Sequence, residues 1–207
     1  MKLFLRIIGA ILLVSGLALI IASISINVIQ AQEKESALES FYEALPNTEN
    51  GESTDDELQT VSLEDSDGNT LLNSSEIIYV VRIPKIDSKE PVKEGTNKSA
   101  LSASLGHEPG TASPGEIGNC VIAGHRNYNF GKYFNRLDEV EVGDEIFVDT
   151  RDDTYEYKVT EIKVVNPEDV EILDPTDDEQ LTLYTCTPIY IATHRLVVIA
   201  KRTEENA

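Results

Sequence analysis

A run of residues without a charged side chain, Ile7 to Ile29, lies near the N-terminus of this 207-residue chain. As a helix rising 1.5 Å per residue it would be roughly 34 Å long, enough to cross a bilayer core of about 30 Å. Lys2 and Arg6 precede the run and Glu33 follows it, so the positive-inside rule predicts a cytoplasmic N-terminus and an external remainder. A cleaved signal peptide is the alternative, which Ala31 supports, but its apolar core would span only about 7–15 residues. We therefore expect an uncleaved, single-pass anchor in the cell membrane.

The composition excludes several classes of protein. Asp and Glu total 37 and Lys and Arg total 17, so the formal net charge is −20. A nucleic-acid-binding protein would instead need a basic surface to displace counterions from phosphates. Two cysteines and three histidines are too few for a disulfide-rich scaffold, a four-cysteine zinc site or a histidine-built metal cluster. The function must therefore come from a small number of reactive side chains.

The segment after the apolar run carries much of the acidic excess. Between Glu33 and Glu76 it has 13 acidic residues and one basic residue. The stretch Asn47 to Asp67 has too few apolar side chains to offset its chain entropy, which predicts a flexible, self-repelling stalk. Just before it, apolar side chains recur at helical spacing and predict a short amphipathic helix, either on the membrane surface or packed on the rest of the protein. These side chains are Leu38, Phe41, Tyr42 and Leu45.

The chain from Ile77 onward has the pattern of short, evenly spaced β-strands. Each run is rich in β-branched or aromatic residues, or alternates apolar and polar side chains, and most end at Pro, Gly or acidic turn residues. The runs are Ile77 to Ile83, Asn119 to Ala123, Asp144 to Thr150, Thr154 to Val165, Leu181 to Cys186 and Arg195 to Lys201. Such strands are typical of a closed antiparallel barrel or a sandwich. Helical patterns are confined to short pieces, 97–103 and 131–140, and the Gly- and Pro-rich stretch 106–118 should form an ordered loop.

These patterns divide the chain into four expected parts. Residues 1–6 would be cytoplasmic, 7–29 would be the transmembrane anchor, 30–76 would be the juxtamembrane helix and acidic stalk, and 77–207 would be a folded β domain. The last part has the length of one ordinary domain, and no internal repeat is visible in it.

The reactive side chain with the most informative position is Cys186, which ends the run TLYTC just before Thr187 and Pro188. A thiol where a strand breaks at the mouth of a barrel can be both held in place and reached by a substrate. It becomes a nucleophile only as a thiolate, which requires a neighbouring base or cation. The candidate bases and cations are His107, His125, His194, Arg126 and Arg195. Because His125 follows one strand and Arg195 begins another, strand pairing could bring both to the same rim as Cys186.

Five motifs, in this order along the chain, resemble those of the sortases, the membrane-anchored cysteine transpeptidases of Gram-positive bacterial surfaces. They are IPKI from Ile83, PGT from Pro109, PGEIGNCVIAGHR from Pro114, LTLYTCTP from Leu181 and THRLVV from Thr193. The pattern TLxTC alone would be weak, but with an upstream GH and a downstream Arg at a strand start the combination is specific. The resemblance covers about Ile77 to Lys201. It implies a mainly β catalytic domain, an eight-stranded barrel with short helices, behind the transmembrane helix and the stalk.

The resemblance also implies a role for each reactive group. Cys186 would attack the Thr–Gly carbonyl of an LPXTG-like sorting signal and form a thioacyl enzyme. His125 would be the general acid and base, and Arg195 would stabilise the oxyanion or the substrate carbonyl. Thr185 would help to bind the substrate or the oxyanion. An amine of a cell-wall precursor or of a pilin would then take the acyl group, and a short apolar groove should hold the Leu-Pro part of the signal.

The remaining reactive residues have simpler interpretations. Cys120 is expected to be a small buried hydrophobe, although a disulfide with Cys186 is the rival on an oxidising cell surface. His107 is expected to order a loop, His194 to lie on the surface, and Arg126 to be solvated or salt-bridged. The acidic residues lack EF-hand spacing, so we expect no cofactor; Ca²⁺ held by loop carboxylates, as in some sortases, is the alternative.

The subclass and the fate of the acyl-enzyme are left open by the sequence. Pilin-polymerising sortases often carry an Asp-Pro-aromatic lid and a second membrane helix, and neither occurs up to Ala207. This favours wall anchoring by a class D or housekeeping-like sortase, although the TCTP and THRLVV motifs look somewhat like the polymerising class. The rival functions are a secreted cysteine protease and a non-catalytic membrane-tethered binding module. A thiol oxidoreductase would normally show CxxC, which this chain lacks.

Overall fold

The computed structural model of the protein describes residues 2–45, 76–126 and 133–203. In chain order its helices (α), 3₁₀ turns (η) and strands (β) are α1 (Lys2–Glu43), β1 (Ile77–Ile83), η2 (Pro84–Ile86), β2 (Ser88–Glu94), η3 (Ala100–Ser102), β3 (Leu105–His107), β4 (Gly118–Ala123), η4 (Leu137–Glu139), β5 (Glu145–Asp149), β6 (Thr154–Val165), η5 (Val170–Leu173), β7 (Glu179–Thr187) and β8 (His194–Arg202). The predicted stalk, Asn47 to Asp67, lies outside the described residues.

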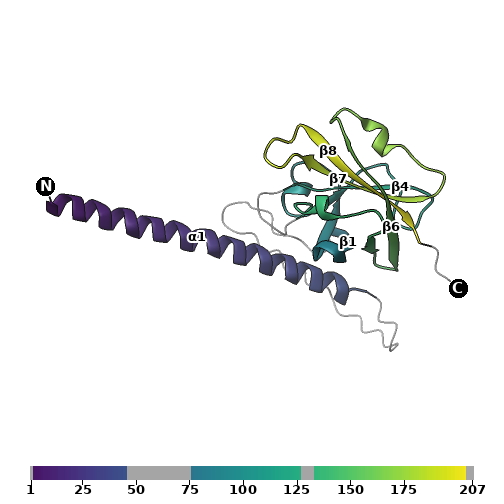
Figure 1. The fold of residues 1–207 in the computed structure, drawn as a ribbon. Coiled ribbons are helices and arrows are strands. Elements are labelled where there is room, and N and C mark those ends of the chain that lie inside the picture. Colours follow the sequence, from purple (N-terminus) through teal and green to yellow (C-terminus); the bar gives the residue numbers. More distant parts are fainter. Residues whose placement is uncertain (1, 46–75, 127–132, 204–207) are drawn as a thin grey trace.

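The eight strands form a closed barrel in the order β1-β2-β3-β4-β7-β8-β6-β5 (Figure 1). This confirms the expected mainly β fold with eight strands and one N-terminal helix. The expectation of a purely antiparallel barrel is wrong at two places, because β2 pairs with β3, and β4 with β7, in parallel. A parallel pair requires a long crossover connection. Between β4 and β7 the chain supplies one through η4, β5, β6 and η5, which brings β7 beside β4.

β2 and β3 are the strands that the sequence pattern did not predict. β2 has the sequence SKEPVKE, in which Pro91 and four charged residues conceal the strand. Two of the charges are buried and paired, since Glu90 lies 2.8 Å from Lys34 and Lys93 lies 2.6 Å from Glu76. Hydrophobic periodicity cannot detect such a strand, because its partners are distant in sequence. β3 is only three residues long and overlaps the stretch that was expected to be a loop.

Alternate residues of the strands fill the interior of the barrel with apolar side chains. The buried cluster includes Val81, Ile83, Val92, Leu105, Cys120, Ile122, Ile146, Val148, Tyr157, Val159, Leu181, Leu183 and Val198. The 3₁₀ turn η4 lies within the helical pattern expected at 131–140, and it adds Leu137, next to Phe134, to this core. η3 lies within the pattern expected at 97–103 and packs beside β3.

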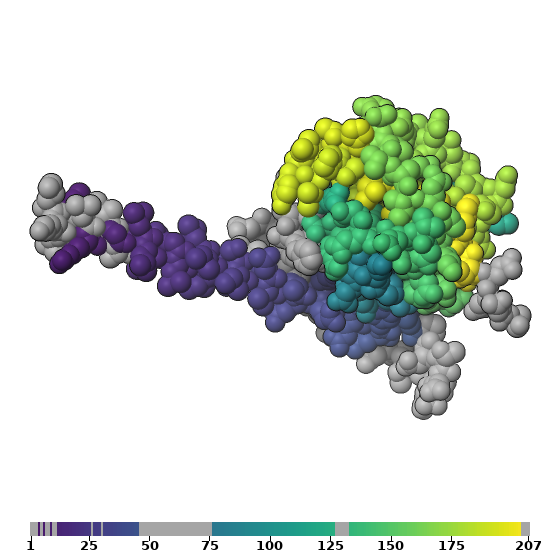
Figure 2. Space-filling view, viewed as in Figure 1, coloured from purple at the N-terminus to yellow at the C-terminus, as the bar shows by residue number. Residues whose placement is uncertain are grey.

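α1 is a single continuous helix through the apolar run and the segment that follows it. By length and hydropathy it is the one candidate membrane-spanning helix among the described residues. Its C-terminal end packs on the barrel, because Ala37, Leu38 and Phe41 are buried against Ile77 and Val80 of β1. Figures 1 and 2 show this end beneath the barrel and the N-terminal half projecting away from it. The amphipathic segment therefore packs on the folded domain and is not a separate helix.

Polar contacts hold the same end of α1 to the barrel. Tyr42 donates a hydrogen bond to Asp149 of β5, and the ammonium of Lys89 lies 4.2 Å from the Tyr42 ring centroid. Arg82 of β1 donates two further hydrogen bonds to Asp149, from Nε at 2.7 Å and from Nη2 at 2.8 Å. Burial alone would raise the pKa of the Asp149 carboxyl, but hydrogen bonds from Arg82, Tyr42 and Thr154 hold it below its usual value of 3.8.

Replacing Asp149 with asparagine should therefore destabilise the protein in a pH-dependent way. Because the pKa of Asp149 is lower in the folded than in the unfolded chain, its ionic contribution is complete above the unfolded pKa and is lost as the pH falls through the folded pKa. We expect Asp149→Asn to be about 1–3 kcal/mol less stable at pH 7, with a smaller difference below about pH 4. Thermal unfolding of the full chain in detergent at pH 7, 4 and 2 measures this, and a difference that stays constant with pH would contradict it.

Candidate active site

The β7–β8 ladder fixes Cys186 and Arg195 opposite each other. They are partners in the antiparallel register of these strands. Directly opposed residues in such a ladder have Cβ atoms about 4.5–5.5 Å apart on the same face of the sheet. Cys186 is near the end of β7 and Arg195 near the start of β8, so both lie at one rim of the barrel, and both side chains are partly exposed.

β4 brings His125 to the same rim. The parallel β4–β7 contacts continue past the end of β4, because Gly124 N donates to Tyr184 O at 3.1 Å and Thr185 Oγ1 donates to Gly124 O at 2.7 Å. With Gly124 beside Thr185, the next residue of the chain, His125, reaches the level of Cys186. His125 is exposed, whereas Thr185 is buried.

The barrel core directly behind His125 fixes its backbone. A Cβ at Gly124 would lie 2.5 Å from Phe134 Cδ2 and 2.6 Å from Leu105 Cδ2, so this close packing requires glycine. Phe134 is fully buried, and its backbone N–H donates to the carbonyl oxygen of His125 at 3.3 Å. The glycine of the GH motif therefore allows the chain to approach the core one residue before the imidazole.

One pocket of about 290 Å³ is lined by all four residues predicted for the site, Cys186, His125, Arg195 and Thr185. Its volume is near the lower end of the roughly 300–1,000 Å³ range of ligand pockets. The Arg195 guanidinium has five N–H donors, of which Nη1 donates to the carbonyl oxygen of His194 at 3.2 Å. The hydroxyl proton of Thr185 is taken by Gly124 O, so toward a ligand this hydroxyl can only accept a hydrogen bond.

One wall of the pocket is formed mainly by residues outside the motifs that the sequence analysis named. The connection from β6 to β7 and the turn η3 contribute Asn166, Pro167, Asp169, Val170, Ile172, Leu173 and Leu101. The η5 side chains among them remain at least partly exposed. Three apolar side chains between Pro167 and Pro175, those of Val170, Ile172 and Leu173, are the signal that could have identified this wall. These apolar side chains line the same pocket as Cys186, which is where the short apolar groove was expected.

A family model described as the sortase domain matches residues 81–203, which is more than half of the chain and most of the barrel. The chain belongs to the sortase family. Sortase SrtE1 of Streptomyces coelicolor is 36% identical to this sortase over 143 residues, which cover 61% of this chain and 40% of that protein. Sortase D of Bacillus subtilis is 32% identical over 127 residues, which cover 59% of this chain and 62% of that protein. The match therefore spans less than two thirds of either relative.

Solved sortase structures have the same barrel. Sortase A from Corynebacterium diphtheriae, a lid mutant, gives a TM-score of 0.59 at 37% identity, covering 62% of this chain and 70% of that one. A Clostridium perfringens Sortase D5 transpeptidase gives 0.57 at 37% identity, covering 61% and 79%. Sortase C1 of GBS Pilus Island 1 gives 0.59 at 37% identity, covering 62% and 64%. This sortase is thus similar to members with different subclass names.

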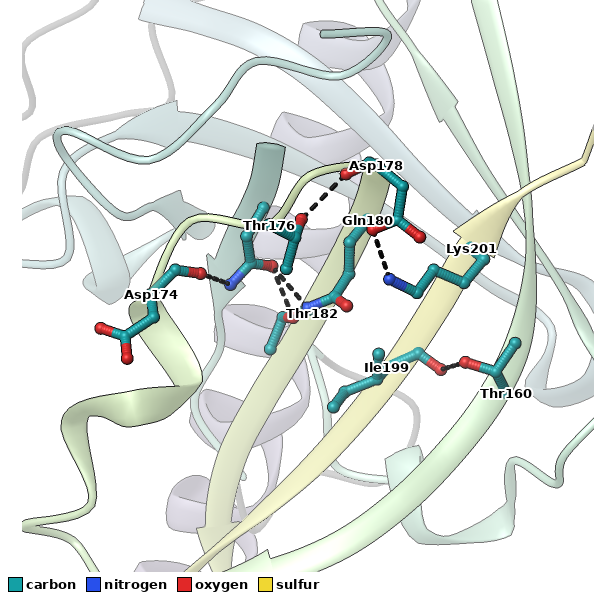
Figure 3. A network of polar contacts seen from close by, with 9 residues as sticks. Thr160, Asp174, Thr176, Asp178, Gln180, Thr182, Ile199 and Lys201 are labelled. Carbon is teal, nitrogen blue, oxygen red and sulfur yellow. Dashed lines mark hydrogen bonds and ion pairs between the residues drawn. The ribbon is translucent and has the colours of Figure 1, made fainter. Parts of the chain in front are cut away.

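One buried amide, Asn119, supports the η5 wall of the sortase pocket. Figure 3 labels three of its partners, Asp174, Gln180 and Thr182. Its Nδ2 donates to the carbonyl oxygens of Ile172 and Asp174, at 2.9 and 3.1 Å. Its Oδ1 accepts from Thr182 Oγ1 at 2.7 Å and from Gln180 Nε2 at 3.1 Å. These four hydrogen bonds use both amide protons and both lone pairs, so they fix the orientation of the amide. The side chain therefore ties η5 to β4 and β7.

A second hollow, of about 170 Å³, is also lined by Cys186 and His125. Arg126 contributes to its lining, as do residues of the β7–β8 connection. The Arg126 side chain is 8% exposed, with Nη2 2.7 Å from Asp138 Oδ2 and Nη1 donating to Thr187 Oγ1 at 2.9 Å. The expectation of a salt-bridged Arg126 is confirmed. The guanidinium therefore links Arg126, which follows His125, to Thr187, which follows Cys186.

The two cysteines differ sharply in their surroundings. Both are free thiols, which contradicts the rival disulfide interpretation in this structure. Cys120 is 1% exposed within the barrel core, which confirms the expected small buried hydrophobe. Burial, with smaller contributions from Glu116 and Glu94, raises the pKa of the Cys120 thiol to about 12. It is therefore uncharged at neutral pH, whereas Cys186 opens into the pocket.

The other two histidines occupy the surroundings that the sequence predicted. His107 is buried, with Nδ1 2.9 Å from Glu94 Oε2 and Nε2 3.0 Å from the carbonyl oxygen of Ala112, so it orders the loop after β3. His194 is exposed and lies 2.9 Å, through Nδ1, from Thr193 Oγ1. Neither lines the described part of the pocket.

Proposed function

We propose that this sortase is a membrane-anchored cysteine transpeptidase that cleaves an LPXTG-like sorting signal between Thr and Gly. It would transfer the protein bearing the signal to an amine of the cell wall. The observation that carries the proposal is that Cys186, His125 and Arg195, from three different strand ends, line one pocket beside an apolar wall. The candidate anchor helix supports a single-pass topology, with the N-terminus in the cytoplasm and a catalytic domain of residues 77–207 outside.

In the first half of the reaction the thiolate of Cys186 attacks the Thr carbonyl carbon of the signal, and a C–S bond forms. The negative charge that develops on the carbonyl oxygen is stabilised by N–H donors of the Arg195 guanidinium. As the C–N bond breaks, His125 gives a proton to the departing Gly amine, which is otherwise a poor leaving group. The product is a thioester between the Thr carbonyl and Cys186.

In the second half an acceptor amine attacks the thioester. His125 takes a proton from the attacking nitrogen, the C–S bond breaks, and the thiolate of Cys186 is regenerated. Thr185 would contribute mainly by holding Gly124, and with it the backbone next to His125. The thiol, imidazole and guanidinium supply every step, so we propose that the reaction requires no cofactor, and activity in the presence of a chelator tests this.

Replacing Arg195 with lysine should lower kcat/KM for the sorting peptide by about 10²–10³-fold, the cost of losing one oxyanion donor in other acyl-transfer enzymes. Lysine keeps the positive charge but not the planar fork of donors, so the charge alone should not restore the rate. Steady-state kinetics of the full chain in detergent micelles measures the effect. If Arg195→Lys retained nearly full activity, Arg195 would act as a simple cation and not as an oxyanion donor.

Replacing Asn119 with alanine should raise KM for the sorting peptide by about 5–30-fold with little change in kcat. The change leaves the Ile172 and Asp174 carbonyls without their amide donor, at a cost of about 1–2 kcal/mol to the ordered η5 wall. The alkylation rate of Cys186 by iodoacetamide, which does not need that wall, should stay the same. Thr182→Val is the matched control, because it removes one bond to the amide and leaves η5 held. An unchanged KM in Asn119→Ala would show that Asn119 does not position the pocket.

The function itself is tested by incubating the full chain in detergent micelles with a library of quenched pentapeptides and candidate amines, with products identified by mass spectrometry. A transpeptidase gives an amide between the peptide and the added amine. A cysteine protease gives only the free acid, whatever amine is present. Absence of cleavage across the library would favour the non-catalytic binding module.

A pilin-polymerising sortase is the second candidate function. The observation in its favour is structural likeness to Sortase C1 of GBS Pilus Island 1. The relative Sortase D of Bacillus subtilis supports instead the wall-anchoring, class D or housekeeping-like type that we favour. The same amine library separates them, since a polymerising enzyme should prefer a lysine ε-amine in a folded pilin over short peptidoglycan-like amines.

A further inference from the structure

We propose that Glu90 of β2 is a positioning residue through which the anchor helix α1 holds the active-site rim in its working arrangement. The rim is defined here as His125, Cys186 and Arg195. The inference rests on the transpeptidase function proposed above and adds to it a working role for the helix. It predicts that the membrane anchor contributes to turnover as well as to location.

Glu90 is a carboxylate buried in the interface between α1 and the barrel. Its residue exposure is 1%, and its Oε1 accepts a hydrogen bond from Lys34 Nζ at 2.8 Å and another from the backbone N–H of Tyr133 at 3.1 Å. A buried carboxylate is costly unless it is paired and hydrogen-bonded. One oxygen atom thus joins α1, just beyond its apolar run, to the backbone at Tyr133.

Tyr133 is held in an unusual backbone conformation at this contact. Its φ is 51°, in the left-handed region that residues with a Cβ rarely adopt, so surrounding contacts must maintain it. One is the bond to Glu90; another is from its own hydroxyl, which donates to the carbonyl oxygen of Ser102 in η3 at 3.1 Å. Burial, with the nearby charge of Glu90, raises the pKa of Tyr133 to about 12, so the hydroxyl keeps its proton. Leu101 of the pocket wall is the neighbour of Ser102.

The residue after Tyr133 reaches the catalytic histidine directly. Phe134 donates its backbone N–H to the carbonyl oxygen of His125 at 3.3 Å, and its ring lies so near Gly124 that a Cβ there would be 2.5 Å from Phe134 Cδ2. The dipeptide of Tyr133 and Phe134 therefore contacts Glu90 on one side and His125 on the other. A continuous series of contacts leads from Lys34 on α1 to the backbone of His125 and to Ser102, which is next to Leu101 of the pocket wall.

The physical consequence is that the ion pair stabilises one arrangement of the rim. When Lys34 is removed, the buried carboxylate of Glu90 loses the ion pair with α1, and the contacts of its Oε1 must readjust. The backbone N–H of Tyr133 is hydrogen-bonded to the same oxygen of Glu90. When that oxygen moves, the backbone of Tyr133 must therefore shift with it. Mutations along such a contact series change the coupling between sites by about 2- to 30-fold in equilibrium or rate.

The experiment compares four variants of the full chain in nanodiscs: Lys34→Met, Lys34→Arg, Glu90→Gln and the double variant Lys34→Met/Glu90→Gln. Folded enzyme is counted by titrating Cys186 with a thiol reagent, so that lost protein is not mistaken for lost rate. We expect kcat for a sorting peptide to fall about 3- to 30-fold in Lys34→Met, with KM little changed, and to be rescued by Lys34→Arg. Both single changes break the same Lys34–Glu90 ion pair. The kcat of the double variant should therefore be no lower than that of the less active single variant.

The matched control is Lys85→Met/Glu141→Gln, which removes an exposed Lys–Glu pair of 3.4 Å that has no contact with the rim. This control should keep the kcat of the original chain. Unchanged kcat in Lys34→Met and Glu90→Gln, with an active original chain, would overturn the coupling and leave the transpeptidase proposal standing.

A second readout tests the coupling without any substrate. Hydrogen–deuterium exchange at residues 124–126 and 133–137 should be faster in Lys34→Met and Glu90→Gln than in the control variant. If the original chain turned over no peptide, the transpeptidase proposal would fail, and faster exchange would still support the link between α1 and the rim. Exchange rates equal to those of the control would refute that link.

Discussion

The Cys186→Ala variant should lose peptide cleavage and amide transfer by at least about 10⁴-fold, down to the uncatalysed background. The thiolate makes the covalent bond on which both halves of the proposed reaction depend, and alanine cannot form it. Among the pocket residues that the structure describes, Cys186 is the one thiol. Mass spectrometry of the protein after incubation with a sorting peptide measures the same event directly. The thioacyl adduct should form on the original chain and be absent from the variant.

Cys120→Ala is the matched control for this result. Cys120 is buried in the core, and its raised pKa keeps it uncharged, so its removal should leave the adduct and the turnover per folded molecule unchanged. The cost should be confined to stability, about 1 kcal/mol for a small cavity in the core. Turnover that survives in Cys186→Ala would refute the covalent mechanism.

The strands that carry the proposed catalytic groups, and β1 and β6 as well, were predictable because their sequences and surroundings agree locally. β1 and β6 begin and end at the predicted residues, β4 begins one residue earlier than predicted, and β7 and β8 are longer than predicted by one or two residues at each end. Each has β-branched or aromatic residues, and β4 and β7 are closely followed by Gly124 and Pro188, which break the ladder. Cys186, His125 and Arg195 could be named because each lies at or next to an end of a predicted strand. Their assembly in one pocket depended on the register, which single-strand patterns do not contain.

The parts that escaped prediction depend on contacts between residues far apart in the chain. β2 is a strand whose buried charges are satisfied by Lys34 and Glu76, and the positions of those partners cannot be read from SKEPVKE. The η5 wall of the pocket is held by Asn119, 53 residues before Ile172. In both cases buried polar residues are hydrogen-bonded or paired with partners that are distant in sequence, and only the folded structure brings these partners together. Buried polar residues of this kind determine how the pocket is shaped, while the local patterns determine which strands surround it.

Single replacements of the three histidines by alanine should affect catalysis at one position only. His125→Ala should lower kcat/KM for amide transfer by about 10²–10⁴-fold, the usual contribution of a general acid and base. The Gly amine would then have to leave without a proton donor, and the attacking amine would have no base. His194→Ala should transfer at the original rate, because His194 is exposed outside the described pocket lining. The rates are measured as amide product per titrated thiol, with the full chain in detergent micelles.

His107→Ala separates a catalytic effect from a structural one. His107 is buried between Glu94 and the Ala112 carbonyl, so its loss should lower the melting temperature and cost about 1–3 kcal/mol of stability. Below that melting temperature the folded fraction should still transfer the peptide. His125→Ala should show the opposite pattern, with an unchanged melting temperature and almost no product, because its exposed ring contributes little to packing. If His107→Ala or His194→Ala lost transfer per folded molecule while His125→Ala kept it, the general acid and base would lie elsewhere, and the mechanism built on the His125 imidazole would be wrong.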